Sequence, residues 1–398
     1  MNSEKISAEG RKKIVFLALS FFFVFGFSNV SYFLPVYYAQ IGMKSGDSAG
    51  WLVAAFYILS VISRPFLANI VENWGFRRVF IAAGVLSVLS SAGVLLSGVS
   101  FWPGFISRAL LGVASSIFLI GLATYQAIAF KEEERGRAFS LIMAGGLAPM
   151  MTIVPFADWL LLHQHNGLYI LMPLLVCLGA AVITPSIPGI ESVHRRRTTK
   201  KNGQSVLAGL SACLRVPHFR LALLSLFLFS VADAAAAFMA PMTRHYGLMA
   251  SLFLSANAVI GVLVRLFCGK LLDRIPRNKL APAAVLLTSG MLFLATISPT
   301  PKSLIALGLI FGVGMGLGFP LHLALISDYV PDHLQPQAVS LSWFLMGVNF
   351  AVVSLMMGWL GDFFGPVPVF RIITGLVIVG AILEYPALIR ISSNRSNG

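Results

Sequence analysis

Residues 68–78, ANIVENWGFRR, return in altered form as residues 269–279, GKLLDRIPRNK. In both stretches a small residue stands four positions before an acid, a turn-forming residue follows the acid by three, and basic residues come next. Arg64 and Arg265 lie upstream of the two stretches at the same spacing. A 398-residue chain that repeats at about half its length indicates duplication of one module. In membrane proteins such internal repeats are typical of alternating-access carriers.

The composition excludes a soluble protein. Hydrophobic residues make up 57% of the chain and charged residues 11%, whereas a soluble domain contains about 25% charged residues. The three cysteines, Cys177, Cys213 and Cys268, are too few and too scattered for a disulfide framework or a metal site. We therefore expect a membrane protein that holds neither a metal nor a cofactor.

Twelve apolar runs reach the length of about 20 residues that a helix needs to cross a bilayer. The first is uncharged from Ile14 to Met43, longer than the apolar core of about 7–15 residues in a signal peptide, so we expect it to be retained. Runs such as residues 221–231 lack the period-two alternation of a membrane barrel. The predicted spans are residues 14–39, 49–71, 79–98, 102–129, 138–161, 167–187, 219–243, 250–272, 280–298, 303–328, 338–361 and 367–389.

These spans predict an all-α integral membrane protein with two pseudo-symmetric six-helix bundles. The N-terminal bundle comprises residues 1–187 and the C-terminal bundle residues 218–398. A basic cytoplasmic linker, residues 188–217, joins them and contains HRRRTTKK at residues 194–201. This linker either serves only to fix the topology or also binds anionic lipid.

The basic residues predict the orientation. With both termini in the cytoplasm, the cytoplasmic segments hold 22 of the 29 Lys and Arg residues, and the outer loops hold Lys44, Arg244 and Lys302. This asymmetry follows the positive-inside rule. The net charge of +14 then faces anionic lipid, which argues against nucleic acid as a partner. We expect a monomer in the inner membrane of a bacterium.

The twelve spans, the basic linker at mid-chain and the paired loop stretches together resemble the major facilitator superfamily over nearly the whole chain. The loop motif of that family is Gly-x-x-x-Asp-Arg-x-Gly-x-Arg-Arg. The second copy here keeps Gly269, Asp273 and Arg274. Positions that depart from the motif include Ala68, Glu72 and Asn73 in the first copy and Pro276 in the second.

The resemblance implies that the acids of the two loop stretches form a cytoplasmic gate. A carboxylate is favoured at a helix N-terminus, where free N–H groups and the helix dipole attract negative charge. The resemblance places Glu72 near the start of span 11 and Asp273 near the start of span 5. The basic members of this gate are Arg77, Arg78 and Arg274. Arg64 and Arg265, about two turns above the acids, fit a gate or a structural clamp better than substrate contact.

Spans 4 and 5 carry weaker family motifs. Residues 108–116, RALLGVASS, resemble the Arg-x-x-Gln-Gly-x-Gly-Ala-Ala pattern of proton-coupled members, with Leu111 in place of Gln. Residues 148–151, APMM, are a faint version of the antiporter motif Gly-Pro-x-x-Gly-Gly. In overall pattern the chain is similar to sugar-efflux and arabinose-efflux-like permeases and to drug:proton antiporters.

Asp233 and Arg108 are the main functional candidates within the spans, because a charge at mid-membrane costs about 2.5–3.5 kcal/mol on insertion scales. Asp233 lies near the middle of span 7 beside small residues 234–237. It is a proton acceptor or a partner for a substrate cation, or else a neutral acid bonded to a neighbouring helix. Arg108, in the outer third of span 4, binds a substrate carboxylate or tunes an acid, or else bonds carbonyls of adjacent helices.

Weaker candidates in the spans fit ligand contact and helix–helix hydrogen bonding equally well. They are Asn29, Tyr32, Tyr125, Gln126, Asn257, His322 and Asn349. His322 is a candidate for titration near neutral pH, where a free imidazole changes its charge, although a packing histidine is the simpler interpretation. We expect Glu384, near the cytoplasmic end of span 12, to reach water, and Asp158 and Asp362 to be rim charges. Span 10 carries five glycines within residues 308–318, which indicate tight packing or a hinge.

Together these features predict a secondary active transporter whose bundles rock around a small organic solute near the bilayer midplane. The sequence contains no phosphate-binding Gly-x-x-x-x-Gly-Lys motif, so we expect an ion gradient, and first of all protons, to drive transport. Proton-coupled export of a sugar, a siderophore-like carboxylate or an amphipathic drug is the first interpretation. Proton-coupled import of a small anionic metabolite, gripped by Arg108, is the alternative.

Two other protein classes fit the sequence less well. An intramembrane enzyme needs a converging catalytic set, but His163 and His165 have only Asp158 near them in the sequence. A receptor or assembly factor that transports nothing is the remaining alternative.

Overall fold

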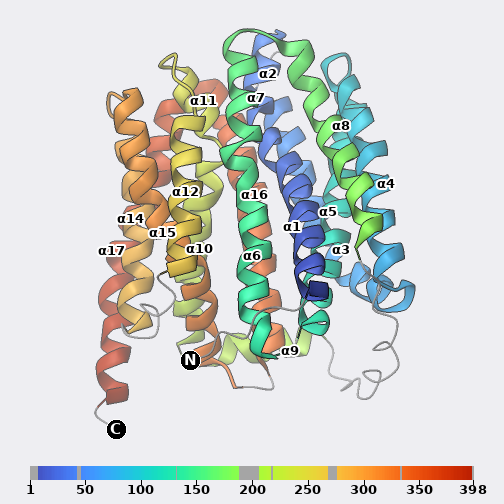
Figure 1. The fold of residues 1–398 in the computed structure, drawn as a ribbon. Helices are drawn as coiled ribbons and strands as arrows, with labels where there is room; N and C mark the ends of the chain where they lie inside the picture. Colours follow the sequence, from blue (N-terminus) through green and yellow to red (C-terminus); the bar gives the residue numbers. More distant parts are fainter. Residues whose placement is uncertain are drawn as a thin grey trace. The chain divides into compact units, whose positions relative to one another are not determined.

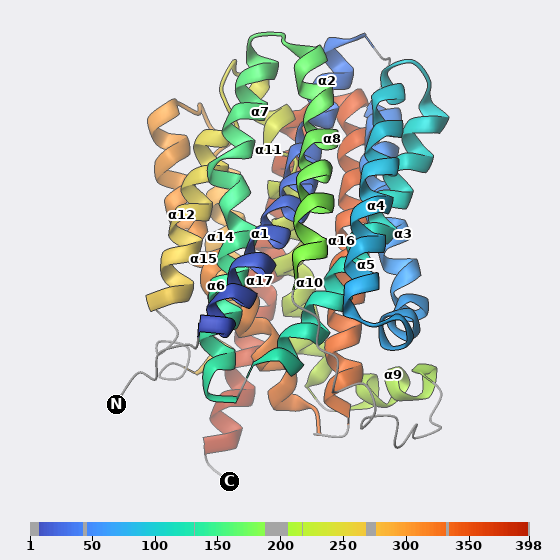
Figure 2. The same cartoon turned by 45° about the vertical axis from the view of Figure 1, so that its right-hand side comes forward.

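The computed structural model describes residues 8–42, 46–130, 132–187, 206–216, 218–267, 276–331 and 334–396. Within these ranges the chain is helical and contains no β-strand. Contacts between helices divide it into two compact units, one from each half of the sequence. Figure 1 and Figure 2 show that long helices make up both halves.

The first unit contains predicted spans 1 to 6. Spans 1 and 5 are each divided into two helices, and two other spans end in a short 3-10 turn. The elements are α1 (Ala8–Val30), η1 (Ser31–Phe33), α2 (Leu34–Gln40), α3 (Gly46–Trp74), α4 (Phe76–Val94), η2 (Leu95–Gly98), α5 (Phe101–Ala129), α6 (Glu132–Met151), α7 (Ile153–Leu162), α8 (Asn166–Ile183) and η3 (Thr184–Ser186).

The second unit contains predicted spans 7 to 12, preceded by a helix in the linker region. Span 7 is divided into two helices, as span 1 is in the first unit. The elements are α9 (Val206–Arg215), α10 (Phe219–Ala236), α11 (Met239–Arg244), α12 (Ser251–Phe267), α14 (Arg277–Leu294), α15 (Pro301–Tyr329), α16 (Gln335–Phe364) and α17 (Pro366–Ser396).

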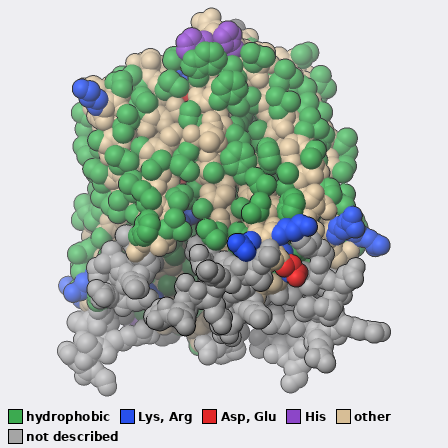
Figure 3. All heavy atoms as spheres, viewed as in Figure 1, with side chains coloured by type: hydrophobic (Ala, Val, Ile, Leu, Met, Phe, Trp, Pro, Cys, Tyr) green, Lys and Arg blue, Asp and Glu red, His purple; other side chains and the backbone are tan. Residues whose placement is uncertain are grey.

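The membrane spans agree with the twelve that the sequence predicts. In the described part of the chain, nine helical stretches are long and apolar enough to cross a bilayer, and α3 and α12 add two shorter apolar stretches. With α14 these make twelve. In Figure 3 apolar side chains cover the visible face between the helix ends, and the Lys and Arg side chains gather mainly toward one end of it. The protein is therefore an all-α integral membrane protein.

The internal repeat is visible in where the helices begin. α5 and α15 are each 29 residues long and begin 200 positions apart. α8 and α17 also begin 200 positions apart. The offset of about 200 that the loop stretches indicated thus extends over these helices and pairs the residues of α5 and α8 with counterparts in α15 and α17.

One helix crossing recurs in both units. α3 meets α5 at Gly112, where an added Cβ would lie 2.1 Å from the carbonyl oxygen of Phe56. α12 meets α15 at Gly312, where an added Cβ would lie 2.6 Å from the carbonyl oxygen of Asn257. These two pairs are counterparts in the repeat. Only glycine lets the backbones come so close, so the tight-packing interpretation of the span-10 glycines is confirmed at Gly312.

The same crossing continues one turn further along each helix pair. In the first unit the Ser116 hydroxyl donates a hydrogen bond to the carbonyl oxygen of Ser60, at 2.9 Å. In the second unit an added Cβ on Gly316 would lie 3.3 Å from the carbonyl oxygen of Gly261. The two units therefore share a backbone arrangement and differ in the side chains that fill it.

A break divides the first span of each unit, although the sequence predicts continuous helices at residues 14–39 and 219–243. Pro35 lies four residues after Ser31, and Pro241 lies four residues after Ala237. A proline ring collides with the carbonyl four residues before it and offers that carbonyl no N–H. Each proline therefore accounts for a break, which lies between α1 and α2 in the first unit and between α10 and α11 in the second.

Each unit has a core of its own. In the first, aromatic side chains such as Phe80 and Phe118 are fully buried among α1, α4 and α5. In the second, Phe219 and Leu325 belong to a cluster built from α10, α14, α15 and the beginning of α16. Polar side chains inside these units therefore have few polar neighbours, and their contacts can be described one by one.

Candidate functional site

Arg108 is enclosed by the first unit, with 1% of the residue exposed. Its Nε donates a hydrogen bond to the carbonyl oxygen of Leu52 on α3, at 3.0 Å, and its Nη1 donates to the Ser31 hydroxyl, at 2.8 Å. The guanidinium carbon lies 5.5 Å from the ring centre of Phe27 and 5.0 Å from that of Phe56, which is cation–π geometry. Arg108 thus joins α3 and α5 to the break after α1.

Four tyrosines surround this cation within electrostatic range. They are Tyr32, Tyr38, Tyr57 and Tyr169. The hydroxyl of Tyr169, on α8, donates a hydrogen bond of 2.8 Å to the carbonyl oxygen of Val30, at the helix end where carbonyls lack their usual N–H partners. Sequence reasoning missed Tyr169, because a single tyrosine in an apolar span carries no distinct signal.

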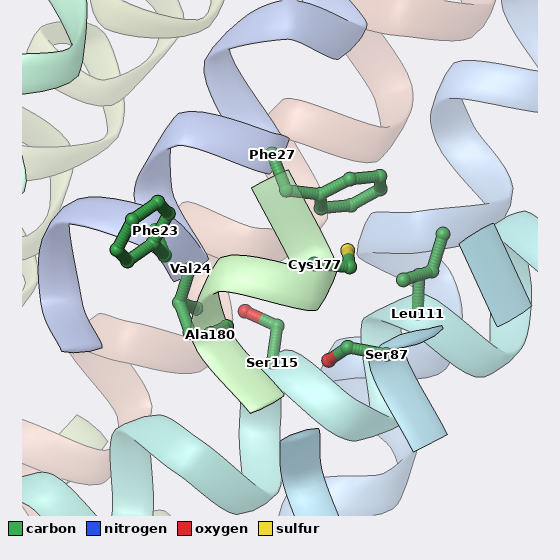
Figure 4. Close-up of a pocket in the computed structure, with 8 residues that line it drawn as sticks. All are labelled: Phe23, Val24, Phe27, Ser87, Leu111, Ser115, Cys177 and Ala180. Atoms are coloured by element: carbon green, nitrogen blue, oxygen red, sulfur yellow. The ribbon is translucent and has the colours of Figure 1, made fainter. Parts of the chain in front are cut away.

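A small cavity lies in the same unit, between α1, α4, α5 and α8 (Figure 4). Its volume is about 10 Å³, which is room for about one water molecule, whereas ligand pockets measure roughly 300–1,000 Å³. Its lining residues are Phe23, Val24, Phe27, Ser87, Leu111, Ser115, Cys177 and Ala180. A cavity of this size cannot hold an organic solute.

Asn29 is the polar residue next to the break in the first unit. It is 2% exposed, and its amide nitrogen has no hydrogen-bond partner among the described residues. Leaving a buried donor unsatisfied costs about 1–3 kcal/mol. Tyr32 follows within η1 and is half-buried. Of these two span-1 candidates, Asn29 is the one with a donor left over for a ligand.

Asp233 lies in the last turn of α10, just before the break in the second unit. It is half-buried, and small buried residues follow it. Its carboxyl group interacts electrostatically with the guanidinium of Arg265 on α12. The structure therefore brings together two residues that the sequence analysis placed in different groups, because α10 and α12 belong to the same unit.

His322 is completely buried on α15. Its Nδ1 lies 2.6 Å from the carbonyl oxygen of Gly318, and its Nε2 lies 3.1 Å from the hydroxyl of Ser225 on α10. The ring of Phe229 stacks on the imidazole at 4.7 Å between centroids. Both ring nitrogens are thus engaged by the protein, and Ser225 is a partner that sequence reasoning missed.

Two acids are buried where the sequence predicts contact with water. Glu384 is 3% exposed. That expectation is wrong because α17 runs to Ser396, so that Glu384 lies three turns before the end of the helix and inside the second unit. Asp158 on α7 is 1% exposed and is not a rim charge, whereas Asp362 at the end of α16 is exposed as predicted.

Asn349 links two helices of the second unit. Its amide nitrogen donates a hydrogen bond of 3.1 Å to the carbonyl oxygen of Phe227 and another to the Ser230 hydroxyl. Asn257 is 8% exposed, on the α12 face that meets α15. For Asn349 the hydrogen-bonding interpretation therefore fits the contacts.

Tyr125 belongs to the aromatic core of the first unit. It is completely buried, with its ring centre 5.4 Å from that of Phe76 and 6.1 Å from that of Phe80. This packing favours a core role over ligand contact. The side chain of Gln126 lies outside the described residues.

Three of the seven predicted gate residues, both acids among them, lie outside the described part of the chain. This applies to Asp273, Arg274 and the side chain of Glu72. Arg77 and Arg78 are exposed in the first turn of α4, and Arg64 is half-buried on α3. Their gate role stays a prediction.

An ion pair that the sequence did not indicate links α14 to α15. Arg277 Nη1 lies 2.6 and 2.9 Å from the two carboxylate oxygens of Asp328. Because Asp328 stands 51 positions away in the sequence, only the helix packing reveals the contact.

Comparison with known proteins identifies relatives over the whole chain. The family profile described as Major Facilitator Superfamily matches residues 16–348 and 280–395. The chain is 26% identical over 304 residues to the "Chloramphenicol resistance protein" of Streptomyces lividans, covering 74% of each chain. It is 24% identical over 379 residues to "Multidrug resistance protein 2" of Bacillus subtilis (strain 168), covering 91% of this chain and 89% of that protein.

Solved structures share the fold. A structure described as a POT family transporter in complex with 5-aminolevulinic acid superimposes with a TM-score of 0.74. It covers 95% of this chain and 96% of that chain at 13% sequence identity. At so low an identity the likeness extends to the fold and not to the ligand.

Proposed function

Since this chain belongs to the major facilitator superfamily and is a secondary transporter, we propose that it exports a small amphipathic organic molecule in exchange for protons. It works in the cytoplasmic membrane of a bacterium, as a monomer with both termini in the cytoplasm. The cargo, the proton and membrane lipid are its only partners, and it uses no cofactor.

The position of Asp233 is the observation that carries the proton part of this proposal. Asp233 is an ionisable group in the last turn of α10, next to a helix break and within electrostatic range of Arg265. Transporters bind cargo and coupling ions at such discontinuous helices. Protonation of the carboxyl group would remove its attraction to the guanidinium, which gives the second unit two states of different charge.

The first unit supplies the polar group at the matching break. The unpartnered amide nitrogen of Asn29 is a donor that a cargo carbonyl or hydroxyl would satisfy. On this basis we assign Asn29 to cargo binding in the first unit and Asp233 to proton binding in the second. Arg108 is instead a structural residue in this proposal, because Leu52 and Ser31 accept its hydrogen bonds.

The names of the relatives support export of a drug-like molecule. Those named for chloramphenicol or multidrug resistance cover 74–92% of the chain. Chloramphenicol is therefore the first cargo to test, and sugars and siderophore-like carboxylates come next. Import of an anionic metabolite has less support, since it requires Arg108 to reach the cargo.

The cytoplasmic gate completes the proposed cycle. Glu72 and Asp273 would each bind the start of a helix when the cytoplasmic side is closed, by the helix-dipole attraction given above. The basic residues Arg77, Arg78 and Arg274 follow the acids in the loops. Arg64 belongs with this gate, whereas we assign Arg265 to the proton site because it lies within electrostatic range of Asp233.

Transport into proteoliposomes tests the direction and the coupling. An acidic lumen drives chloramphenicol uptake by an antiporter and an alkaline lumen drives uptake by a symporter, whichever way the protein is inserted. We expect uptake with the acidic lumen. Asp233→Asn should reduce gradient-driven uptake to the level of protein-free vesicles while exchange of labelled for unlabelled chloramphenicol continues.

Asp362→Asn is the matched control, since it removes an exposed acid at the end of α16, and it should transport like the wild type. Uptake with the alkaline lumen would contradict export. If Asp233→Asn loses exchange as well as gradient-driven uptake, the assignment of Asp233 to proton binding is contradicted.

A further inference from the structure

Three polar side chains meet inside the second unit and are not used by the proposed function. Ser225 on α10 and His322 on α15 are completely buried, and Glu384 on α17 is 3% exposed. They come from three different helices, so only the packing of the unit brings them together. Apolar contacts enclose them: the Phe229 ring stacks on His322, and α17 packs against α10 and α14.

The hydrogen bonds of His322 determine which nitrogen carries a proton. A carbonyl oxygen only accepts, so Nδ1 must donate to the Gly318 carbonyl oxygen 2.6 Å away. In the neutral imidazole Nε2 is then an acceptor and receives the Ser225 hydroxyl proton across 3.1 Å. In the imidazolium Nε2 also carries a proton, and the Ser225 oxygen becomes the acceptor.

Glu384 lies next to this pair without a hydrogen bond of its own. Neither carboxyl oxygen has a partner among the described residues, and the Ser225 hydroxyl is the side chain that interacts with the carboxyl group. An unpartnered carboxylate in such surroundings is costly. The Ser225 hydroxyl has one proton to donate, and it can serve either His322 or Glu384.

We propose that Glu384, Ser225 and His322 form a proton relay inside the second unit. In one state Glu384 is a carboxylic acid and donates to the Ser225 oxygen, while Ser225 donates to the neutral His322. In the other, the Glu384 proton has moved to the Ser225 oxygen and the former Ser225 proton to Nε2. One O–H bond breaks and one forms at Ser225, and the products are a carboxylate and an imidazolium.

The net charge of the relay changes only when a proton enters or leaves it. Loss of one proton leaves Glu384 as a carboxylate beside a neutral His322. The relay deepens the proposed function and rests on it in one respect, namely that this proton is exchanged during the transport cycle. Proton binding by the three side chains follows from their contacts alone.

Few other ionisable groups lie near the relay. Beyond the first turn of α14, and before Asp362 at the end of α16, these two helices carry no titratable side chain. On α10, the exposed Arg220 stands five positions before Ser225 and Asp233 eight positions after it, and on α15 the exposed Asp328 and the buried Tyr329 stand six and seven positions after His322. Tyr385 follows Glu384 on α17 but is 37% exposed. His322 and Glu384 are thus buried, whereas Arg220, Asp328 and Tyr385 are exposed.

Infrared spectroscopy of the purified protein tests the relay without any cargo. The carbonyl stretch of a protonated, buried carboxylic acid is followed as the pH is raised. The wild type should show such a band and lose it in a single titration. Glu384→Gln should lack the band, and Glu384→Asp should restore one. Asp233→Asn is the control that removes a different acid and should keep the Glu384 band.

His322 and Ser225 are tested through the midpoint of the same titration. Interacting groups shift each other by about one pH unit or more, so His322→Gln should move the midpoint by at least that amount. In a Ser225→Ala background the His322 substitution should move it less. A band that persists in Glu384→Gln, or an unchanged midpoint in His322→Gln, overturns the relay. Thermal unfolding of each variant establishes that it is folded.

Proteoliposomes separate failure of the relay from failure of the proposed function. With chloramphenicol as the probe, Glu384→Gln should lose uptake driven by the pH gradient and keep exchange without a gradient. If the wild type does not transport chloramphenicol, the proposed cargo fails while the infrared result still decides whether the relay exists. If Glu384→Gln keeps gradient-driven uptake, the role of the relay in transport is overturned.

Discussion

The two units share one backbone crossing but bury different ionisable groups. In the first unit Arg108 donates a hydrogen bond to the carbonyl oxygen of Leu52. Its counterpart 200 positions later is Gly308, where an added Cβ would lie 2.5 Å from the carbonyl oxygen of Phe253. At this position a cation therefore joins the helices in one unit, and direct backbone contact does so in the other.

At two other positions the second unit buries an ionisable side chain and the first unit does not. His322 and Glu384 stand where the first unit has Leu122 and Thr184, each 200 positions earlier. All four are almost completely buried. Backbone contacts that sterics dictate were kept after duplication, whereas the buried ionisable groups diverged. The ionisable groups are therefore the place to look for functions that belong to one unit only.

The largest loss of stability should come from substitutions at the shared helix crossing. Gly112→Ala forces a Cβ against the Phe56 carbonyl, a backbone atom that cannot move cheaply, and should lower the free energy of unfolding by about 3 kcal/mol. Gly312→Ala, with more room at 2.6 Å, should lower it by about 1–2 kcal/mol. Detergent-induced unfolding of the purified protein measures both.

Gly290→Ala is the control for these glycines, because nothing lies within 4 Å of its added Cβ. It should be neutral or stabilise α14 by up to about 1 kcal/mol, the difference in helix propensity. Equal losses at all three positions would mean that the crossing is not a matching feature of the two units.

Methionine substitutions at the two buried ionisable groups should have effects of opposite sign. Arg108→Met removes two hydrogen bonds from a charged donor and should lower the free energy of unfolding by about 2–3 kcal/mol. Glu384→Met removes a buried carboxyl group whose oxygens have no hydrogen-bond partner among the described residues, and it should raise the free energy of unfolding by about 1 kcal/mol. If both variants lose stability equally, the contrast between a bonded cation and an unbonded acid is wrong.

The smallest predicted effects on stability come from removing the hydroxyl groups of two tyrosines. Tyr169→Phe removes a fully buried hydrogen bond to the Val30 carbonyl and should cost about 1 kcal/mol. Tyr246→Phe removes a partly buried bond to the Thr296 carbonyl in the second unit and should cost about half as much. A larger loss at Tyr246 would contradict the view that the first unit depends more on bonds at its helix break.

The sequence predicted the helices well and the helix breaks poorly. Most predicted spans agree with the observed helices to within a few residues, because a run of about 20 apolar residues has no other stable place than a bilayer. The breaks after α1 and α10 were missed although Pro35 and Pro241 indicate them. Proline acts on the carbonyl four residues earlier, and this local signal does not alter the hydropathy of a span.

The candidate site could be predicted only in part. Asp233 and Arg108 were identified because a charge in an apolar run stands out. The burial of Glu384, the bond of Tyr169 and the contact between Asp233 and Arg265 were not predicted. In a soluble helix the apolar face indicates the inside, but in a membrane the face toward lipid is equally apolar. Periodicity therefore does not tell which side of a span faces its neighbours.

The sequence by itself determined that this chain crosses a membrane twelve times and consists of two related halves. Both conclusions depend on sums over many residues, namely apolar length and a repeat offset, so single substitutions do not obscure them. Only the tertiary structure decided that Arg108 is bonded and Glu384 is not. A hydrogen bond requires two groups from distant parts of the chain to meet within about 3 Å, and helix rotation and packing alone decide whether they do.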